Sequence, residues 1–152
     1  MQRVHASLAV FCAGLILALA APMFAADDQK AKPKNAPTLD DSTATLTEFV
    51  DGKEKQSKID LKYCLKVKGY FDNAGFHIEE VEDGGPATHL TGAGSSLEKG
   101  DTITKIDGKS IKSAADYAKA MNGASDHDKV KLRVRDVNSG DEVEVEAETA
   151  KR

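Results

Sequence analysis

The chain has 152 residues and a formal net charge of −4 at pH 7, with 25 acidic against 21 basic residues. That balance argues against a nucleic-acid partner, because nucleic-acid binding rewards a strongly basic surface. Tryptophan is absent and aromatic residues make up only 5% of the chain, so we expect a core of mostly aliphatic side chains.

The first 26 residues have the layout of a secretory signal peptide. Arg3 supplies a basic start, an almost unbroken apolar run extends from Leu8 to Ala21, and small residues follow at Ala25-Ala26. The run is shorter than the roughly 20 apolar residues that span a bilayer comfortably. We therefore expect export to the periplasm or out of the cell, without stable membrane insertion after cleavage. The alternative is that the leader stays uncleaved as an N-terminal anchor.

Removal of the leader leaves about 125 residues, enough for one domain with one core. Arg3 leaves with it, so 20 of the 21 basic residues remain against 25 acidic ones and the net charge becomes −5. Cys64 is then the only cysteine, and a single cysteine cannot form an internal disulfide. We expect Cys64 to be a small packing residue, with a reactive or intermolecular thiol as the alternative.

Residues 27–42 are rich in Lys, Pro, Asp and Ala and show no apolar period, so we interpret them as a flexible linker. From Thr43 to Val50 the residues favour a strand, Asp51-Gly52 is a turn signal, and a weaker alternation continues to Leu61. Residues 43–60 are therefore predicted to form a strand or hairpin that extends the main domain.

The middle of the chain contains three predicted strands separated by turn residues. Apolar and polar residues alternate along each of them, namely Tyr63–Tyr70, Phe76–Val81 and Thr102–Ile106. The second alternation slips near Glu79-Glu80, which a bulge can absorb. Pro86 to Leu90 predicts a short helix, because Pro is favoured in a first helical turn. The small residues from Thr91 to Ser96 predict a loop.

The last third of the chain predicts one helix and one hairpin. Ser113 is a plausible N-cap for a helix that runs to about Met121, with Asp116 placed to support the cap. Strict alternation in Val130–Arg135 and again in Val143–Glu146 predicts a hairpin with one solvent-exposed face. Together these elements define an α+β, mainly β fold class, a small six-stranded antiparallel partly open barrel capped by two helices.

Three stretches of the sequence carry a family resemblance when they are taken in order. They are Gly75–Ala87, which ends in Gly-Gly-Pro-Ala, Leu97–Ile111, which contains Gly-Asp and Asp-Gly turns, and the helix from Ser113 to Met121 followed by the strand Val130–Arg135. Their order and separation resemble the PDZ domain, in the variety that accompanies exported bacterial serine proteases. The resemblance implies a PDZ-like domain over residues 61–149 in a stand-alone PDZ protein.

The resemblance also implies a binding groove. PDZ domains add an extended peptide as a strand, and backbone amides in the loop before the receiving strand hold its terminal carboxylate. The corresponding loop here is Lys62–Leu65, where Cys64 stands in place of the family's usual Gly, and the receiving strand is Leu65–Lys68. The implied peptide-binding residues are Lys62, Tyr63, Cys64, Leu65, Lys66, Val67, Ala114, Ala118 and Met121. Tyr117 and Ala120 are expected to face inward or flank the core. Small Ala residues with a flexible Met favour a ligand with an apolar last residue, such as Val, Leu, Ala or Phe.

The sequence carries no recognisable catalytic motif. It has neither a His-Glu-x-x-His metal pair nor a Gly-x-Ser-x-Gly nucleophile. We interpret His77 as an exposed polar residue of a strand, His127 as part of a solvated turn, and Ser95-Ser96 as a flexible spacer. We therefore expect a protein that is not an enzyme, with no cofactor and no metal.

The expected partners are protein C-termini or extended peptides with an apolar end, which the chain would bind as a scaffold. One alternative is an accessory domain that docks on a folded partner such as a protease, with the hairpin of residues 43–61 as its docking element. Another is a structural domain that self-associates through Cys64 or an exposed sheet edge. The sequence leaves the partner's identity and the oligomeric state open.

Overall fold

The computed structural model describes residues 31–92, 96–124 and 129–152. The predicted signal peptide, the first four residues of the predicted linker, Ser95 and His127 lie outside these ranges. In the described part of the chain, no helix is both long and apolar enough to cross a membrane.

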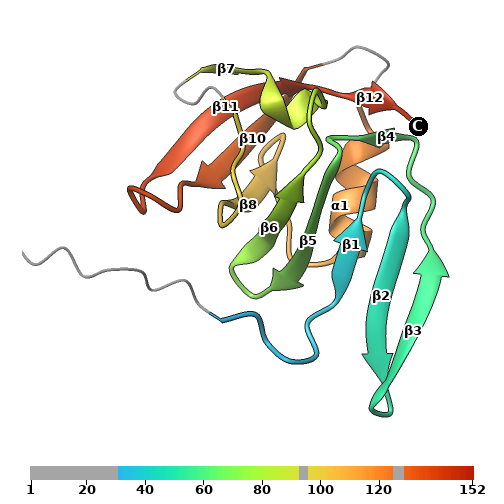
Figure 1. Ribbon diagram of the computed structural model, residues 1–152. Helices are drawn as coiled ribbons and strands as arrows, with labels where there is room; N and C mark the ends of the chain where they lie inside the picture. The colour runs from blue at the N-terminus through green and yellow to red at the C-terminus, as the bar shows by residue number, and fades with distance from the viewer. Residues whose placement is uncertain (1–30, 93–95, 125–128) are drawn as a thin grey trace, which may run out of the picture.

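The fold is dominated by one large antiparallel sheet with the strand order β3-β2-β1-β5-β6-β8-β10-β11-β7, and β9 pairs with β8 at its side (Figure 1). A separate pair joins β12 to β4. The strands are β1 (Thr38–Asp40), β2 (Thr45–Val50), β3 (Lys53–Lys58), β4 (Tyr63–Cys64), β5 (Val67–Asp72), β6 (Gly75–Val81), β7 (Leu90–Gly92), β8 (Thr102–Ile106), β9 (Lys109–Ser110), β10 (Lys129–Arg135), β11 (Glu142–Glu148) and β12 (Ala150–Lys151). The helices are a short 3-10 helix η1 (Pro86–Thr88) and the α-helix α1 (Ala114–Met121).

The structure confirms a mainly β, antiparallel fold with one α-helix but differs from the expected strand count. It contains twelve strands rather than six, and the described residues form an open sheet with β3 and β7 at its edges. Five of the twelve strands have only two or three residues. Such short strands are too brief to leave a period of two in the sequence, so their existence depends on pairing with distant segments.

The expected flexible linker contains an ordered strand. β1 pairs on one side with β2 and on the other side with β5. Leu39 and Asp41 have no exposed surface, and Ala36 is only 5% exposed. One buried leucine among polar neighbours gives no apolar period, so the order of this segment comes from its two neighbouring strands.

β2 and β3 form a hairpin around Asp51-Gly52, and both turn residues have positive φ angles of 52° and 74°. This geometry suits a two-residue hairpin turn. We call residues 38–58, which comprise β1, β2 and β3, the N-terminal arm.

The continuous strand expected over Tyr63–Tyr70 is interrupted. It consists of β4 and β5, separated by Leu65 and Lys66. Lys66 has a positive φ of 61°, which no regular strand residue adopts. The alternation of Leu65 with Val67 still holds, since both side chains are buried. The alternating side chains on either side of the turn are therefore still buried, although the backbone changes direction between β4 and β5.

The predicted bulge in the second central strand is confirmed. Lys68 lies opposite Glu80 and Gly69 lies opposite Ile78, so Glu79 is the extra residue of β6. The short helix after Gly84-Gly85 is also confirmed as η1, although it ends at Thr88, and β7 takes the last residue of the predicted helix and the first two of the predicted loop. The hairpin of β10 with β11 pairs Arg133 with Glu144, consistent with a solvent-exposed charged face.

The helix α1 begins at the predicted N-cap. The backbone amide of Asp116 donates to the Ser113 hydroxyl oxygen at 3.2 Å, and that hydroxyl donates to the Asp116 carboxylate at 2.8 Å. The helix packs Tyr117 and Ala120 inward, where Tyr117 meets the ring of Phe76 at a centroid distance of 5.2 Å. The core therefore lies between this helix and the central strands.

Replacing Ser113 with alanine is expected to destabilise the protein by about 1 kcal/mol, because the first helical turn loses its side-chain acceptor. Chemical denaturation followed by far-UV circular dichroism measures the change. Ser113→Thr is the matched control, since it keeps the hydroxyl and should remain close to the wild type. Equal stability of all three proteins would contradict a capping role.

Candidate functional site

The candidate site is the side of β5 that faces away from β6, together with the loop Lys62–Lys66 that precedes it. We call this the receiving edge. The Lys62 side chain is exposed, whereas Cys64, Leu65 and Val67 are buried. The site is thus made chiefly of backbone groups, and side chains from other elements form hydrogen bonds with them.

The loop is held in place at its start by contacts with distant segments. Cys64 lies opposite Ala150 in the pair of β4 with β12. The Lys62 amide donates to the Asn122 side-chain oxygen at 2.7 Å, and the Lys62 carbonyl accepts from the Arg152 amide at 3.0 Å. Residues just after α1, in β12 and directly after β12 therefore set the loop's position.

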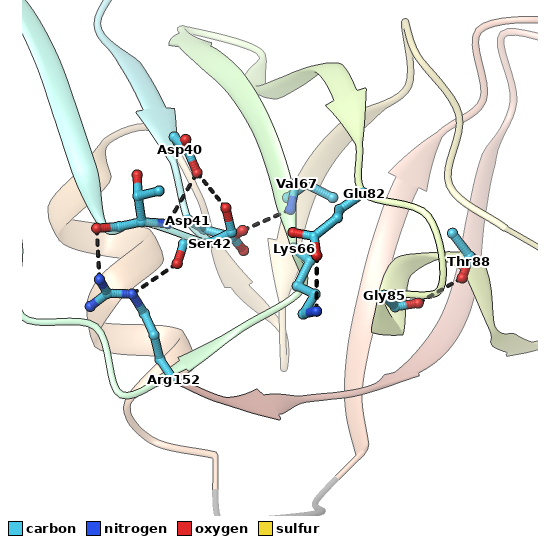
Figure 2. A network of polar contacts seen from close by, with 10 residues as sticks. Asp40, Asp41, Ser42, Lys66, Val67, Glu82, Gly85, Thr88 and Arg152 are labelled. Carbon is cyan, nitrogen blue, oxygen red and sulfur yellow. Dashed lines mark hydrogen bonds and ion pairs between the residues drawn. The ribbon is translucent and has the colours of Figure 1, made fainter.

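Two backbone amides of the receiving edge converge on one carboxylate. Leu65 N–H donates to Asp41 Oδ2 at 2.8 Å, and Val67 N–H donates to Asp41 Oδ1 at 2.7 Å. The positive φ of Lys66 between them accompanies this turn of the backbone. Figure 2 shows the bond between Asp41 and Val67 beside the Lys66 turn. The arrangement is a two-amide carboxylate site, one residue on either side of Lys66.

A third donor reaches the same carboxylate from the helix. The Tyr117 hydroxyl donates to Asp41 Oδ2 at 2.7 Å, and neither residue has any exposed surface. Burial raises the pKa of Asp41 to about 6, although the three hydrogen bonds oppose that shift. Burial and the neighbouring Asp41 carboxylate also raise the pKa of Tyr117, so its hydroxyl remains a donor.

The segment that carries Asp41 lies along β5 as an antiparallel strand. Asp41 N–H donates to the Val67 carbonyl at 3.1 Å, and Phe71 N–H donates to the Pro37 carbonyl at 2.9 Å. Between these bonds Leu39 lies opposite Gly69. The strand runs towards the loop Lys62–Lys66 and places the Asp41 carboxylate at the amides of Leu65 and Val67.

The turn that follows Asp41 is fixed by the guanidinium of Arg152. Arg152 Nη2 donates to the Thr43 carbonyl at 2.7 Å and Nε donates to the Ser42 carbonyl at 3.1 Å (Figure 2). The Asp40 carboxylate also accepts from the Ser42 hydroxyl at 2.8 Å. These contacts hold the chain in the bend that turns β1 back into β2.

The structure brings together only part of the predicted site. The loop and the Leu65 and Val67 amides gather at one place beside α1. The Lys66 ammonium points elsewhere, to Glu82 at 3.0 Å. On the helix Ala118 is half-buried, Ala114 is 8% exposed and Met121 has no exposed surface, so Met121 is a core residue here.

Sequence reasoning missed the three side chains that complete the site, namely Asp41, Tyr117 in its role as a donor, and Arg152. Asp41 stands in a polar stretch without periodicity, and no local signal marks it as buried. Tyr117 was expected to face inward, which the structure shows, but its hydroxyl partner lies 76 residues away in the sequence. Such pairings follow from the tertiary fold alone.

The prediction that His77 is exposed was wrong. Its side chain is only 14% exposed, and its Nε2 lies 2.8 Å from the Asp72 carboxylate. Its Nδ1 lies 2.9 Å from the Thr102 hydroxyl, and its ring stacks on Tyr70 with centroids 4.8 Å apart. The polar face of β6 is covered by neighbours from β5 and β8, which the alternation of a single strand does not reveal.

Cys64 is buried, with 3% exposure, and it forms no disulfide. Burial raises the pKa of its thiol. Within the ranges that the structure describes, no three His, Cys, Asp or Glu side chains are grouped so that they could hold a metal ion.

An antiparallel sheet in which one strand pairs with a further strand beside a helix is the architecture of the class of modules that bind extended chains by strand addition. Consistent with this class, the sequence profile of the PDZ domain family matches residues 77–136. The match supports the PDZ family for this part of the chain. PDZ domains are protein-interaction modules: they bind peptides and are not catalytic domains. No match to a curated protein was found.

The matched region runs from β6 into the turn after β10, and it includes both helices. The receiving edge and the N-terminal arm lie before it in the sequence. The family match and the geometry of the receiving edge are therefore separate observations.

Proposed function

We propose that this chain is an exported, non-catalytic module, similar to the PDZ domains of exported bacterial proteases, that captures extended peptides at the receiving edge. One observation carries the proposal: the edge pairs with an antiparallel strand and its two amides hold a carboxylate at the end of that strand. This is the chemistry of strand addition, in which main-chain bonds supply affinity.

The preferred ligand is a peptide with a free C-terminal carboxylate and an apolar last residue. The donors at the Leu65 and Val67 amides fit a carboxylate, and the neighbouring helix α1 offers the small side chain of the half-buried Ala118, with the buried Ala114 one turn before it. The leader pattern in residues 1–26 supports a periplasmic or secreted location. N-terminal sequencing of the protein recovered from the exported fraction tests that location directly.

Peptide capture is tested with residues 27–152, which retain every residue that the structure describes. A set of random C-terminal peptides, each with a free or an amidated end, is titrated up to millimolar concentration. We expect nuclear magnetic resonance shifts at the Leu65 and Val67 amides with free ends and much smaller shifts with amidated ends. Binding that ignores amidation, or an absence of binding in every variant of the chain, would overturn the proposal.

Replacing Ala118 with glutamate is expected to abolish peptide binding, because it places a bulky negative charge beside the carboxylate end of the ligand. Ala118 is half-buried on α1, whereas Ala115 is exposed on the same helix. Ala115→Glu is therefore the matched control and should leave the dissociation constant within about two-fold of the wild type. Unchanged affinity in Ala118→Glu would contradict the use of this helix face.

A second candidate function rests on the hairpin of the N-terminal arm. Phe49 and Val50 at its tip are 40% and 48% exposed and are the large hydrophobic side chains exposed in the described part of the chain. An accessory domain that docks on a folded partner, or on a second copy, would use such a tip. This function predicts no affinity for free peptides and loss of the docked complex in a Phe49→Ser/Val50→Ser variant.

A further inference from the structure

The receiving edge is not empty, because the chain's own residues 37–41 occupy it. They lie antiparallel to β5. The Asp41 amide donates a hydrogen bond to the Val67 carbonyl, and the Phe71 amide donates one to the Pro37 carbonyl. They run in the direction required of a peptide whose last residue meets the loop Lys62–Lys66. An external strand that used the same side of β5 would need the same backbone groups.

The carboxylate position is occupied as well. The Asp41 carboxylate accepts hydrogen bonds from the Leu65 and Val67 amides and from the Tyr117 hydroxyl, with donor–acceptor distances of 2.7–2.8 Å. A peptide's terminal carboxylate would need these same donors. Asp41 therefore supplies, from within a continuous chain, the group that a ligand would supply at its end.

We propose that residues 37–41 are a resident ligand of the receiving edge, with β1 as the added strand and Asp41 as the carboxylate, which an external C-terminus must displace. This inference rests on the proposed function. It implies that the apparent affinity for peptides is reduced by the fraction of molecules whose arm is docked.

Only part of the arm contacts the rest of the fold, so displacement of β1 must break a defined set of contacts. Its far strand β3 pairs only with β2, and all of its side chains except the half-buried Ser57 are exposed. Beyond β1, the arm is anchored by Leu46 and Ala44 in the core and by the Arg152 bonds to Ser42 and Thr43. The main anchors of β1 itself are the fully buried Leu39 and Asp41.

The first test weakens the docked arm. In Leu39→Ala the arm loses one of its buried anchors, and we expect peptides with a free C-terminus to bind at least ten-fold more tightly than to the wild type. Val50→Ala is the matched control, because it trims an exposed residue of the same arm and should leave affinity unchanged. Hydrogen exchange at the Phe71 amide reports whether the arm has been released.

The second test locks the arm without touching its buried anchors. Asp40 and Lys68 are opposite each other, between the ladder bonds of Asp41 and Phe71. Such a pair has the close Cα spacing that a disulfide needs. In an Asp40→Cys/Lys68→Cys variant, oxidation should weaken peptide binding at least ten-fold and reduction should restore it. The single Lys68→Cys variant should show no such change.

The outcomes separate the two proposals. Tighter binding in Leu39→Ala together with loss of binding on oxidation supports the resident ligand. Free-carboxylate peptides that bind the wild type, the weakened arm and the locked arm equally would overturn the resident ligand and leave peptide binding in place, at another edge. If hydrogen exchange shows a released arm and no peptide binds, both proposals fail.

Discussion

Asp41→Ala is expected to lower the free energy of unfolding by about 3 kcal/mol at pH 7. The substitution leaves the Leu65 and Val67 amides and the Tyr117 hydroxyl without their acceptor in a buried place. Each orphaned buried donor costs about 1–3 kcal/mol, and part of this is offset because a buried charge has been removed. Urea denaturation at pH 7 measures the loss.

The same variant should change the pH dependence of stability. Because the pKa of Asp41 rises to about 6 on folding from an ordinary value of 3.8, the folded state holds the proton more tightly. The contribution of this group to stability is therefore full below about pH 4 and is lost as the pH rises towards 6, by roughly 3 kcal/mol.

The measurement for this pH effect is the difference between the wild type and Asp41→Ala from pH 4 to pH 7. The destabilisation caused by the substitution should be larger at pH 4 than at pH 7. Asp40→Ala is the control, because that carboxylate serves the neighbouring turn and not the receiving edge. A difference that stays constant with pH would contradict a buried, titrating Asp41.

Gly69→Ala is expected to destabilise the protein by about 3 kcal/mol or more. A Cβ atom at this position would lie 2.0 Å from the His77 carbonyl oxygen and 3.0 Å from the Phe76 ring. Both obstacles are part of β6, so the substitution forces the two central strands apart beside the bulge. Gly69 also lies opposite Leu39, so β1 should loosen from β5. Thermal unfolding and hydrogen exchange at the Phe71 amide measure the two effects.

Gly108→Ala is the matched control for this substitution. Gly108 has a positive φ of 76° and no atom within 4 Å of the added Cβ, so only backbone strain of about 1 kcal/mol applies. Equal destabilisation of the two variants would mean that the close approach of β5 and β6 is relieved without disturbing the strands.

The elements that could be predicted from the sequence were those with a local signal. The period of two indicated β8 and the hairpin of β10 with β11, Ser113 indicated the start of α1, and the slip near Glu79 indicated the bulge. Each of these depends on neighbouring residues in one stretch of chain. Local patterns therefore sufficed for these elements, but not for the short strands β4, β7, β9 and β12.

The occupied receiving edge could not be predicted in the same way. β1 has three residues and only one buried apolar side chain, so it resembles a linker until β5 and β2 lie beside it. The role of Asp41 depends on amides 24 and 26 residues away and on a hydroxyl 76 residues away. The turn at Lys66 likewise interrupts a strand whose alternation continues through it.

The contacts of β12 and Arg152 have a consequence for biosynthesis. The loop Lys62–Lys66 is pinned by Ala150 and Arg152, and the bend after Asp41 is held by the Arg152 side chain. A nascent chain emerging from the ribosome cannot make these contacts until residues 150–152 have been synthesised and have cleared the exit tunnel. The arm and the loop are synthesised early, but this region reaches its final form only after Ala150 and Arg152 are available to contact it.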